Sequence, residues 1–547
     1  MAGEQPSQKR TFTSRGTRPS SEGMGGEPSE VEQLFRYTSG RWLWDEEQQL
    51  KDRYKSFNVS QLQSVAAQAL GAKACNSISK LAEGGFNKVF RLQMDDGRSI
   101  LARIPNPNAG PAFYTTASEV ATMEFARDVL QIPVPQVIGW SATADNPVGS
   151  EYILMEEAIG AQFASVWDEL APGAKLAIMK EVVAIEAKMV SVSLSHYGSI
   201  YFAKDCVEGA VPAQITRKAL DTLKDHVAKT FTIGPTVERD FWKKERSNMD
   251  ISRGPWSSST DFALSIGRRE VEWIKRYAVP KAPDDIMLVS DAQNNPQVHL
   301  DLLHRYLDVV PYLMDISPEF SQPTLWHGDL HSSNIFIQDN RITAVIDWQG
   351  SWAGPLFLQA QPSPLVDYQG ELLLSRPDNF DELNPDTQAQ IKRKIFKSTL
   401  SQLYLLETER QNPLLAKVLQ MDYGKTRRLP VQQAGNTWDD DIVGLRESLI
   451  QVEKLWQDLG TTGNCPYHFT EEELKNHLAD ADGWNEVQDF FDSIEDLVQR
   501  DGWTHHETFE QARRFFEELR EVGLKRMKCK KEREIFDKQT AWARSRK

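Results

Sequence analysis

The sequence predicts an α+β fold of two lobes, a small antiparallel β-sheet followed by a larger and mainly helical part. Two changes in the spacing of apolar residues carry this prediction. From Ile78 onward apolar and polar residues alternate, which is typical of half-buried strands, whereas residues 161–320 have helical spacing. At 547 residues the chain also exceeds the roughly 250–300 residues that one core usually serves, so several units are expected.

The composition is that of a globular protein, and it argues against several classes of function. Hydrophobic residues make up 40% and charged residues 26%, and the formal net charge of −15 speaks against nucleic acid as a partner. No apolar run reaches the ~18 residues that span a bilayer, so no transmembrane segment is expected. The four cysteines form no C-x-x-C pair, which disfavours a zinc or disulfide framework and fits a reducing compartment.

The first 30 residues are rich in Ser, Thr, Gly and Pro and contain almost no large apolar side chains. They cannot bury a core, so we expect a disordered arm. Several Lys and Arg residues lie among its Ser and Thr, a composition that resembles a mitochondrial targeting segment. Pro6, Gly16 and Pro19 interrupt any amphipathic helix, and a plain disordered tail on a cytoplasmic protein is the alternative.

Helices and then strands follow the arm. Residues 31–72 have helical spacing, with Ser60 as a possible N-cap. Apolar residues then alternate over residues 90–94, and the turn Asp95-Asp96-Gly97 leads into a second strand, Ile100–Ile104. These two strands begin the sheet of the small lobe.

A glycine pair precedes the first of these strands, in the stretch E-G-G-F-N-K over residues 83–88. Gly84 and Gly85 would let backbone N–H groups approach anionic oxygens closely. Gly-Gly by itself indicates no more than a turn, but its position between strands favours a loop that covers phosphate groups.

A helix and a further strand complete the small lobe. Thr116 and Glu119 have the spacing of a capping box at the start of a helix that continues to Leu130, before Pro133 stops it. Tyr152–Met155 is the next apolar strand.

The most informative stretch is residues 325–350, L-W-H-G-D-L-H-S-S-N-I-F-I-Q-D-N-R-I-T-A-V-I-D-W-Q-G. Asp339-Asn340 is a turn signal between two apolar runs, Ile335–Ile337 and Ile342–Ile346, and predicts a β-hairpin. A hairpin brings its two ends together, so the residues that flank it should be neighbours in space.

Three oxygen-bearing side chains, Asp329, Asn334 and Asp347, are expected to converge at the open end of this hairpin. Carboxylate and amide oxygens suit a hard cation such as Mg²⁺. Asp329, five residues before Asn334, would accept a hydrogen bond from an incoming hydroxyl. This is the arrangement that kinases use for phosphoryl transfer.

The pattern H-G-D-L-H-S-S-N followed by V-I-D-W resembles the signature of the aminoglycoside phosphotransferase family. The resemblance implies a two-lobed protein-kinase-like fold, with ATP and Mg²⁺ as cofactors. It implies a small-molecule hydroxyl as the phosphate acceptor, but not an antibiotic, because relatives phosphorylate other metabolites. A pseudokinase or nucleotide-binding scaffold, which turns nothing over, is the alternative.

The resemblance also assigns roles to individual residues. It makes Asp329 the catalytic base and Asn334 and Asp347 the metal ligands. The residues expected to contact nucleotide are Gly84, Gly85, Phe86, Asn87, Lys88, Arg103, Glu119, Glu156, Glu157 and Ala158. Glu156, Glu157 and Ala158 would contact adenine through main-chain atoms.

Arg103 falls where kinases carry the strand lysine, with Glu119 as its helix partner. Arginine keeps the charge and can bind phosphate bidentately, but it is bulkier than lysine. Glu119 could instead serve only the capping box.

The remaining chain reads as helical. Asn384-Pro385 is expected to start a helix, as are two capping boxes, Thr470…Glu473 and Thr504…Glu507. The dense Lys and Arg of residues 525–547 indicate a solvated helix face. Acidic helices after residue 360, if they line the acceptor site, would favour a cationic or polyhydroxyl substrate.

We therefore divide the chain into four parts. Residues 1–30 form the arm and residues 31–160 the nucleotide lobe. Residues 161–430 form the helical lobe with the 325–350 signature, and residues 431–547 a helical C-terminal extension.

Overall fold

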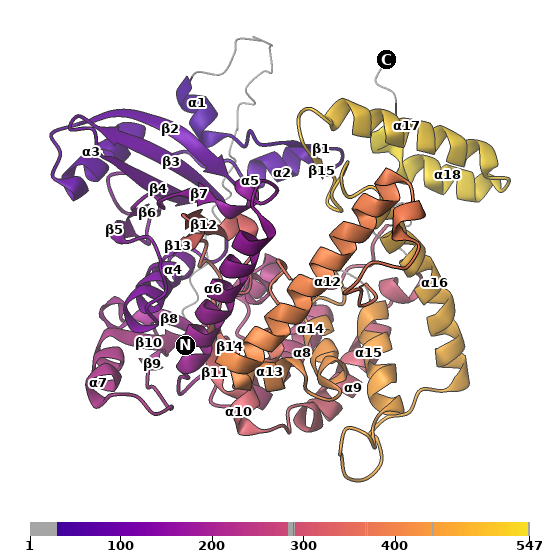
Figure 1. The fold of residues 1–547 in the computed structure, drawn as a ribbon. Coiled ribbons are helices and arrows are strands. Elements are labelled where there is room, and N and C mark those ends of the chain that lie inside the picture. The colour runs from indigo at the N-terminus through magenta and orange to yellow at the C-terminus, as the bar shows by residue number, and fades with distance from the viewer. Residues whose placement is uncertain are drawn as a thin grey trace, which may run out of the picture.

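The computed structural model describes residues 30–282, 288, 290–366, 368, 370–439 and 442–544. The predicted disordered arm lies outside these residues except for Glu30, with which α1 (Glu30–Phe35) begins. The predicted two-lobed α+β architecture is confirmed, and Figure 1 shows the small lobe with its sheet above the helices of the larger lobe. Within the described residues, no helix has the length and apolar character that crossing a membrane requires.

The small lobe is built on a five-stranded antiparallel sheet in the order β2-β3-β4-β6-β5. Its strands are β2 (Cys75–Glu83), β3 (Asn87–Met94), β4 (Ser99–Pro105), β5 (Val137–Ser141) and β6 (Tyr152–Met155). Even-numbered residues of β3 and β4 are buried on one face, where α3 (Val59–Leu70) packs with Leu62 and Ala66. The N-cap of α3 is Asn58, whose side chain accepts from the Gln61 N–H, so the prediction of Ser60 was wrong.

Helix α4 (Tyr114–Glu124) is almost entirely buried and continues through a π-helical turn, Phe125–Val129. The predicted capping box does not form, because the helix already begins at Tyr114 and Thr116 lies inside it. The Thr116 hydroxyl donates instead to Glu151, 3.0 Å away. Glu119 is therefore not needed as a capping residue.

The large lobe packs α6 (Pro172–Ser191), α8 (Ser259–Tyr277) and α9 (Pro296–Leu313) around one core. Residues 161–320 also contain a three-stranded sheet, which the prediction of a mostly helical region missed. Its strands are β8 (Ser199–Phe202), β9 (Val211–Pro212) and β10 (Phe231–Gly234). Its strands are only two to four residues long, too short to leave a period in the sequence. Shorter helices of this region are α5 (Phe163–Val166), α7 (Asp221–Thr230), α10 (Pro318–Ser321) and α11 (Leu356–Gln359).

The predicted hairpin is present as β12 (Ile335–Gln338) and β13 (Arg341–Val345). Asp339 and Asn340 both have positive φ, 52° and 60°, as a two-residue hairpin turn requires. The short strand β7 (Ala161–Gln162) pairs with β12. On either side of the hairpin, β11 (Pro323–Trp326) and β14 (Trp352–Pro355) pair with each other, so the loop between β11 and β12 has a fixed base.

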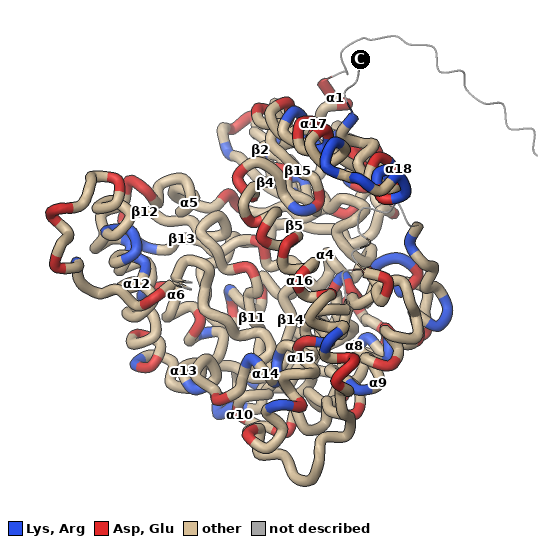
Figure 2. Tube along the Cα trace, turned by 90° about the vertical axis from the view of Figure 1, so that its right-hand side faces the viewer, with Lys and Arg blue, Asp and Glu red and all other residues tan. Residues whose placement is uncertain are grey.

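The rest of the chain is helical. It contains α12 (Pro385–Gln411), α13 (Pro413–Leu419), α14 (Gly424–Gln433), α15 (Val443–Lys454), α16 (Glu471–Ser493), α17 (Phe509–Arg526) and α18 (Lys530–Gln539). The predicted N-cap Asn384 and the capping box at Thr470 are confirmed. No residue of α18 is buried, as expected for its dense basic residues, which Figure 2 shows in blue.

The second capping box was predicted wrongly, since Thr504 lies in a strand, β15 (Trp503–Thr504), and α17 starts only at Phe509. β15 pairs antiparallel with β1 (Arg41–Trp42), which precedes α2 (Glu46–Asp52). Residues 41–42 and 503–504, far apart in the sequence, thus lie side by side, as Figure 1 shows between α2 and α17.

Candidate active site

The loop after β11 holds Asp329 through its own neighbours. The Asn334 side-chain nitrogen donates to the Asp329 carbonyl at 2.9 Å and to Asp329 Oδ2 at 3.2 Å. His331 Nε2 lies 3.4 Å from the same carboxylate oxygen. Asp329 is thereby oriented while its side chain remains 66% exposed and open to a ligand.

His327 fixes this loop against the end of the hairpin. Its ring is fully buried against Trp348, with Nε2 2.9 Å from the Ile346 carbonyl and Nδ1 accepting from the Asp329 N–H. Burial lowers the pKa of His327, so the ring is neutral and carries its proton on Nε2. Sequence reasoning did not select this residue, although its place two positions before Asp329 in H-x-D was a signal.

The hairpin brings Asn334 and Asp347 together, as predicted. The Ile346 N–H donates to the Asn334 carbonyl at 2.9 Å, which makes Asp347 the next residue along. Asp347 has a positive φ of 63°, a strained conformation for a residue with a side chain that is common at functional sites.

Arg103 joins the sheet, α4 and the hairpin. Its guanidinium forms an ion pair with Glu119 and donates to Asp347 Oδ1 at 2.6 Å and to Gln349 Oε1 at 2.9 Å. Arg103 and Glu119 are both buried. Of the two interpretations of Glu119, the ion pair is therefore the one that the structure contains. Gln349 was missed, although it lies two residues after Asp347.

The glycine loop is a short turn between β2 and β3, comprising Gly84, Gly85 and Phe86. The Gly84 N–H donates to the carbonyl of Asn87, 3.0 Å away. The Asn87 side chain donates to Gln349 Oε1 at 2.5 Å, which ties this turn to the residues after Asp347.

Lys88 is not brought to this group. Its side chain is fully buried, and its ammonium donates to the Arg53 carbonyl and to Asn106 Oδ1, the latter at 2.6 Å. Burial lowers the pKa of Lys88 to about 8. The prediction that Lys88 belongs to the phosphate-covering loop stays a prediction, while its side chain is engaged by Arg53 and Asn106 of the small lobe.

The segment after β6 links the two lobes. The Glu156 N–H donates to the Gln136 carbonyl, and the Glu157 carboxylate pairs with Arg91. The peptide groups of Glu157 and Ala158 make no hydrogen bond among the described residues, so they are free to contact a ligand.

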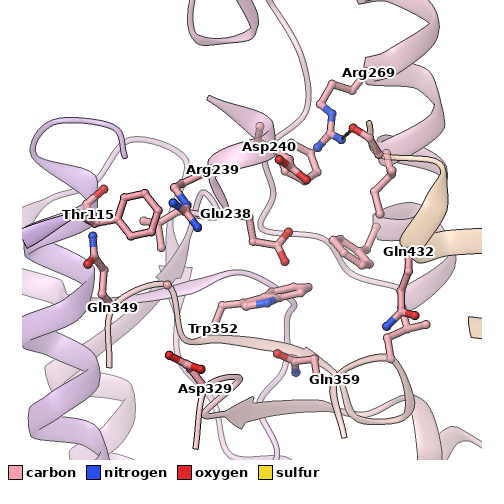
Figure 3. A pocket seen from close by; sticks show the side chains of 18 of the residues that line it. Thr115, Glu238, Arg239, Asp240, Arg269, Asp329, Gln349, Trp352, Gln359 and Gln432 are labelled. Carbon is pink, nitrogen blue, oxygen red and sulfur yellow. Dashed lines mark hydrogen bonds between the residues drawn. The ribbon is translucent and has the colours of Figure 1, made fainter. Parts of the chain in front are cut away.

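A cavity of about 590 Å³ lies where the two lobes meet beside Asp329 and Asp347 (Figure 3). From the small lobe it is lined by Phe86, Ala109 and Thr115. From the large lobe its wall includes Glu238, Arg239, Asp240, Phe241, Arg269, Gln349, Trp352, Gln359, Gln432 and Gly435. The segment after β6 is not among the lining residues, so this cavity is separate from the main-chain groups of Glu157 and Ala158.

The acidic groups of this cavity come from a place that the sequence did not indicate. Among its described lining residues after position 360 there is no acidic one, and whether acidic helices of that region line an acceptor site stays a prediction. Glu238 and Asp240 supply carboxylates instead, from the turn after β10. Burial, together with the neighbouring Asp240, raises the pKa of Glu238 to about 7.

The oxygen donors at the hairpin suit Mg²⁺. The amide oxygen of Asn334 faces away from Asp329, and Asp347 Oδ2 has no hydrogen-bond partner among the described residues. Mg²⁺ is usually held by one or two carboxylates together with substrate phosphates. The described residues contain no cluster of three His, Cys, Asp or Glu side chains that would hold a metal ion.

The chain is similar to several fungal proteins. It is 35% identical over 480 residues to a subtelomeric hrmA-associated cluster protein of Aspergillus fumigatus, covering 80% of this chain and 91% of that protein. It is 26% identical over 515 residues to the protein named altered inheritance of mitochondria protein 9, mitochondrial, of Yarrowia lipolytica, covering 87% of this chain and 85% of that protein. The Saccharomyces cerevisiae protein of the same name is 23% identical over 525 residues, covering 82% and 83%.

Among solved structures, the chain is similar to a thermostable mutant of aminoglycoside phosphotransferase APH(4)-Ia, at 14% identity and a TM-score of 0.35. The match covers 73% of this chain and all of that one. A streptomycin–ATP complex of APH(2")-IIa matches with 12% identity and a TM-score of 0.36, covering 71% and 96%.

The phosphotransferase enzyme family matches residues 77–357, which is more than half of the chain. This range runs from β2 through the glycine loop, Arg103, Glu119 and the hairpin to α11. It contains every residue that the sequence placed in the site. The resemblance that H-G-D-L-H-S-S-N carries is therefore confirmed, and the chain belongs to the phosphotransferase enzyme family.

Proposed function

We propose that the protein transfers the terminal phosphate of ATP, in the presence of Mg²⁺, to a hydroxyl group of a small molecule. The observation that carries this proposal is the convergence of Asp329, Asn334 and Asp347 at one end of the β12–β13 hairpin. Arg103 and Glu119 reach the same place from the small lobe. A hairpin whose only role was structural would have no need of this group.

Each residue has a part in the proposed reaction. Asp329 orients the acceptor hydroxyl and takes up its proton, since its carboxylate is exposed to the cavity. Asn334 Oδ1 and Asp347 hold Mg²⁺, which supplies charge neutralisation at the phosphates. Arg103 and the peptide groups of Gly84–Asn87 bind the phosphates, and the main chain of Glu156–Ala158 binds adenine. Catalysis rests on positioning and electrostatic stabilisation.

The acceptor occupies the cavity beside Asp329. The lining of this cavity favours a compact molecule with hydroxyl or cationic groups. It includes the carboxylates of Glu238 and Asp240 and the aromatic rings of Phe241 and Trp352. Trp352 offers an aromatic face, and the carboxylates accept hydrogen bonds from hydroxyl or ammonium donors.

A nucleotide-binding scaffold without turnover is the second candidate. It is favoured by one observation, the arginine at the position of the kinase lysine, whose guanidinium is engaged by Glu119, Asp347 and Gln349. Both candidates need the nucleotide site, so they differ in the role of Asp329.

Asp329→Asn separates the two candidates. The substitution keeps the size of the side chain but removes its charge and its ability to take up a proton. We expect Mg²⁺-dependent ATP turnover against a panel of hydroxylated metabolites to fall on the order of 10²–10⁴-fold, with ATP affinity little changed. Asp347→Ala, by contrast, should abolish Mg²⁺-dependent ATP binding measured by calorimetry. Full complementation of a null strain by Asp329→Asn, but not by Asp347→Ala, would leave nucleotide binding as the function.

We further propose a mitochondrial location. Two relatives are named mitochondrial, and the first 30 residues are basic and rich in Ser and Thr. A full-length fluorescent fusion should locate to mitochondria, and the same fusion without residues 1–30 should be cytosolic. A cytosolic full-length fusion would contradict the proposal.

A further inference from the structure

Arg239 lines the cavity beside Asp329 and has no role in the reaction described above. Arg239 begins the 3-10 helix η3 (Arg239–Phe241), just after β10, and lines the cavity that Asp329 and Asp347 also line. Its guanidinium lies over the ring of Phe86, 3.6 Å from the ring centre. A residue of the large lobe thus touches the tip of the glycine loop of the small lobe.

The guanidinium of Arg239 is uncommitted. Among the described residues it has no hydrogen-bond or ion-pair acceptor, and the ring of Phe86 is the side chain that it covers. The neighbouring Asp240 pairs instead with Lys243 at 3.2 Å and accepts from Asn436 at 3.2 Å. A free arginine in a chain with a net charge of −15 is poised for an anion from outside the protein.

Lys88, Arg103 and Arg239 differ in how far their charged groups are engaged by the protein. Lys88 donates to Arg53 and Asn106 and points into the core. Arg103 is divided between Glu119, Asp347 and Gln349. Of the three, Arg239 is the one whose guanidinium donates to no acceptor among the described residues, so all its donors are open to phosphate oxygens.

The carboxylates around Arg239 make a positive charge necessary if a phosphate group is to bind in this cavity. Figure 3 shows Glu238, Arg239 and Asp240 on one side of the cavity and Asp329 on the opposite side. A phosphoryl group that passes between these carboxylates would be repelled unless a cation lies beside it. A guanidinium matches phosphate oxygens in shape and keeps its charge at any physiological pH.

We propose that Arg239 binds the terminal phosphate of ATP and stabilises the phosphoryl group during transfer, which rests on the proposed function. Its contact with Phe86, next to Gly84 and Gly85, places it at the phosphate end of the nucleotide. In the reaction the bond from the γ-phosphorus to the bridging oxygen breaks, leaving ADP. The acceptor oxygen bonds to phosphorus, the hydroxyl proton passes to Asp329, and Arg239 keeps all its protons.

The test compares nucleotides with and without the terminal phosphate. Calorimetric affinities for Mg·AMP-PNP and Mg·ADP are measured for the wild type, Arg239→Lys and Arg239→Met. In Arg239→Met the preference for Mg·AMP-PNP over Mg·ADP should fall roughly tenfold or more, because a charge-assisted contact to the terminal phosphate is lost. Arg239→Lys, which keeps a positive charge, should recover part of this preference.

Arg276→Met is the matched control, since Arg276 pairs with Glu272 on the exposed side of α8 and does not line the cavity. It should bind both nucleotides as the wild type does. An unchanged preference in Arg239→Met, or an equal loss for both nucleotides, would overturn the assignment of Arg239 alone. A wild type that binds neither nucleotide would overturn the proposed function itself.

Discussion

At the scale of single residues, the direction in which a side chain points decides its role. Lys88 and Arg103 both fall in stretches that resemble phosphate-binding segments, yet they point to opposite faces of the same sheet. Lys88 has the same strand parity as the buried Phe90 and Leu92, and so it enters the core beneath α3. Arg103 has the opposite parity to Ala102 and Ile104 and reaches Glu119.

Burial also changes the charge of a residue remote from the site. Glu186 on α6 is fully buried, and its partner is the hydroxyl of Tyr404 on α12, which donates at 2.9 Å. Burial raises the pKa of Glu186 to about 8 from an ordinary value of 4.5. The folded protein therefore keeps a proton that the unfolded chain releases as the pH rises between these two values.

Glu186→Gln should remove this pH dependence. The contribution of Glu186 to stability is fully present below about pH 4.5 and is lost as the pH rises from there through about 8, because the buried carboxyl must stay protonated. The amide introduced by the substitution would keep the hydrogen bond without titrating. The variant should gain stability relative to wild type on the order of a few kcal/mol between about pH 5 and pH 8, at about 1.4 kcal/mol per pKa unit.

Urea unfolding at several pH values measures this difference. Glu409→Gln, at an exposed position of the same helix α12, is the control and should show no such trend. A constant difference between Glu186→Gln and wild type across the pH range would contradict a protonated Glu186.

At the scale of elements, local signals predicted more than packing did. The hairpin, its turn and the residues at its open end lie close together in the sequence, so turn chemistry alone brings them together. The pairing of Arg103 with Glu119 follows from adjacent elements of the small lobe. The turn with Glu238, Arg239 and Asp240 has no periodicity or motif in the sequence. It lines the same cavity as Asp329 because the packing of the helices between them in the sequence brings the two segments together. No local pattern in the sequence predicts that these two segments lie close together.

The wall of the cavity depends on a buried charge cluster between elements. Glu270 on α8 accepts two hydrogen bonds from Arg246, of the 3-10 helix η4 (Lys244–Asn248), at 3.0 and 2.6 Å. It also accepts one from Arg269 at 2.8 Å, and Arg269 donates to the Gly435 carbonyl after α14. All three charged side chains are buried, so each depends on the others.

Glu270→Ala should destabilise the protein by about 3–5 kcal/mol, because two buried guanidinium groups would lose the carboxylate that they share, although Arg246 keeps Asp439 at 3.7 Å. The measurement is the free energy of unfolding in urea. Glu272→Ala removes an exposed ion pair with Arg276 on the same helix and should cost less than about 1 kcal/mol. Equal effects of the two substitutions would show that the buried cluster adds nothing to stability.

At the scale of the whole molecule, residues 37–42 contact residues 501–504, far away in the sequence, beside the strand that precedes the glycine loop. β1 pairs with β15, Trp42 donates to Asp501 at 3.0 Å, and Trp503 donates to the Tyr37 hydroxyl at 3.0 Å. The same N-terminal segment supports β2, because the Thr38 N–H donates to Glu83 at 2.6 Å. The segment that pairs with β15 therefore also holds the end of β2, the strand that leads into Gly84.

Gly40→Ala tests this pairing with a single methyl group. A Cβ at position 40 would lie 2.6 Å from the Trp503 ring and 2.7 Å from the Thr504 carbonyl oxygen, so β15 would have to move. We expect a loss of about 1–3 kcal/mol in the free energy of unfolding, as for other overpacked sites. Mg·ATP affinity should also fall, because Thr38 would release Glu83 and loosen the glycine loop.

Gly483→Ala is the matched control, since nothing lies within 4 Å of its added Cβ in the middle of α16. It should leave ATP affinity unchanged and stabilise the helix by roughly 0.5–1 kcal/mol. If Gly40→Ala lowers stability but leaves ATP affinity at the wild-type value, the pairing of β1 with β15 supports the fold alone and has no effect on the nucleotide site.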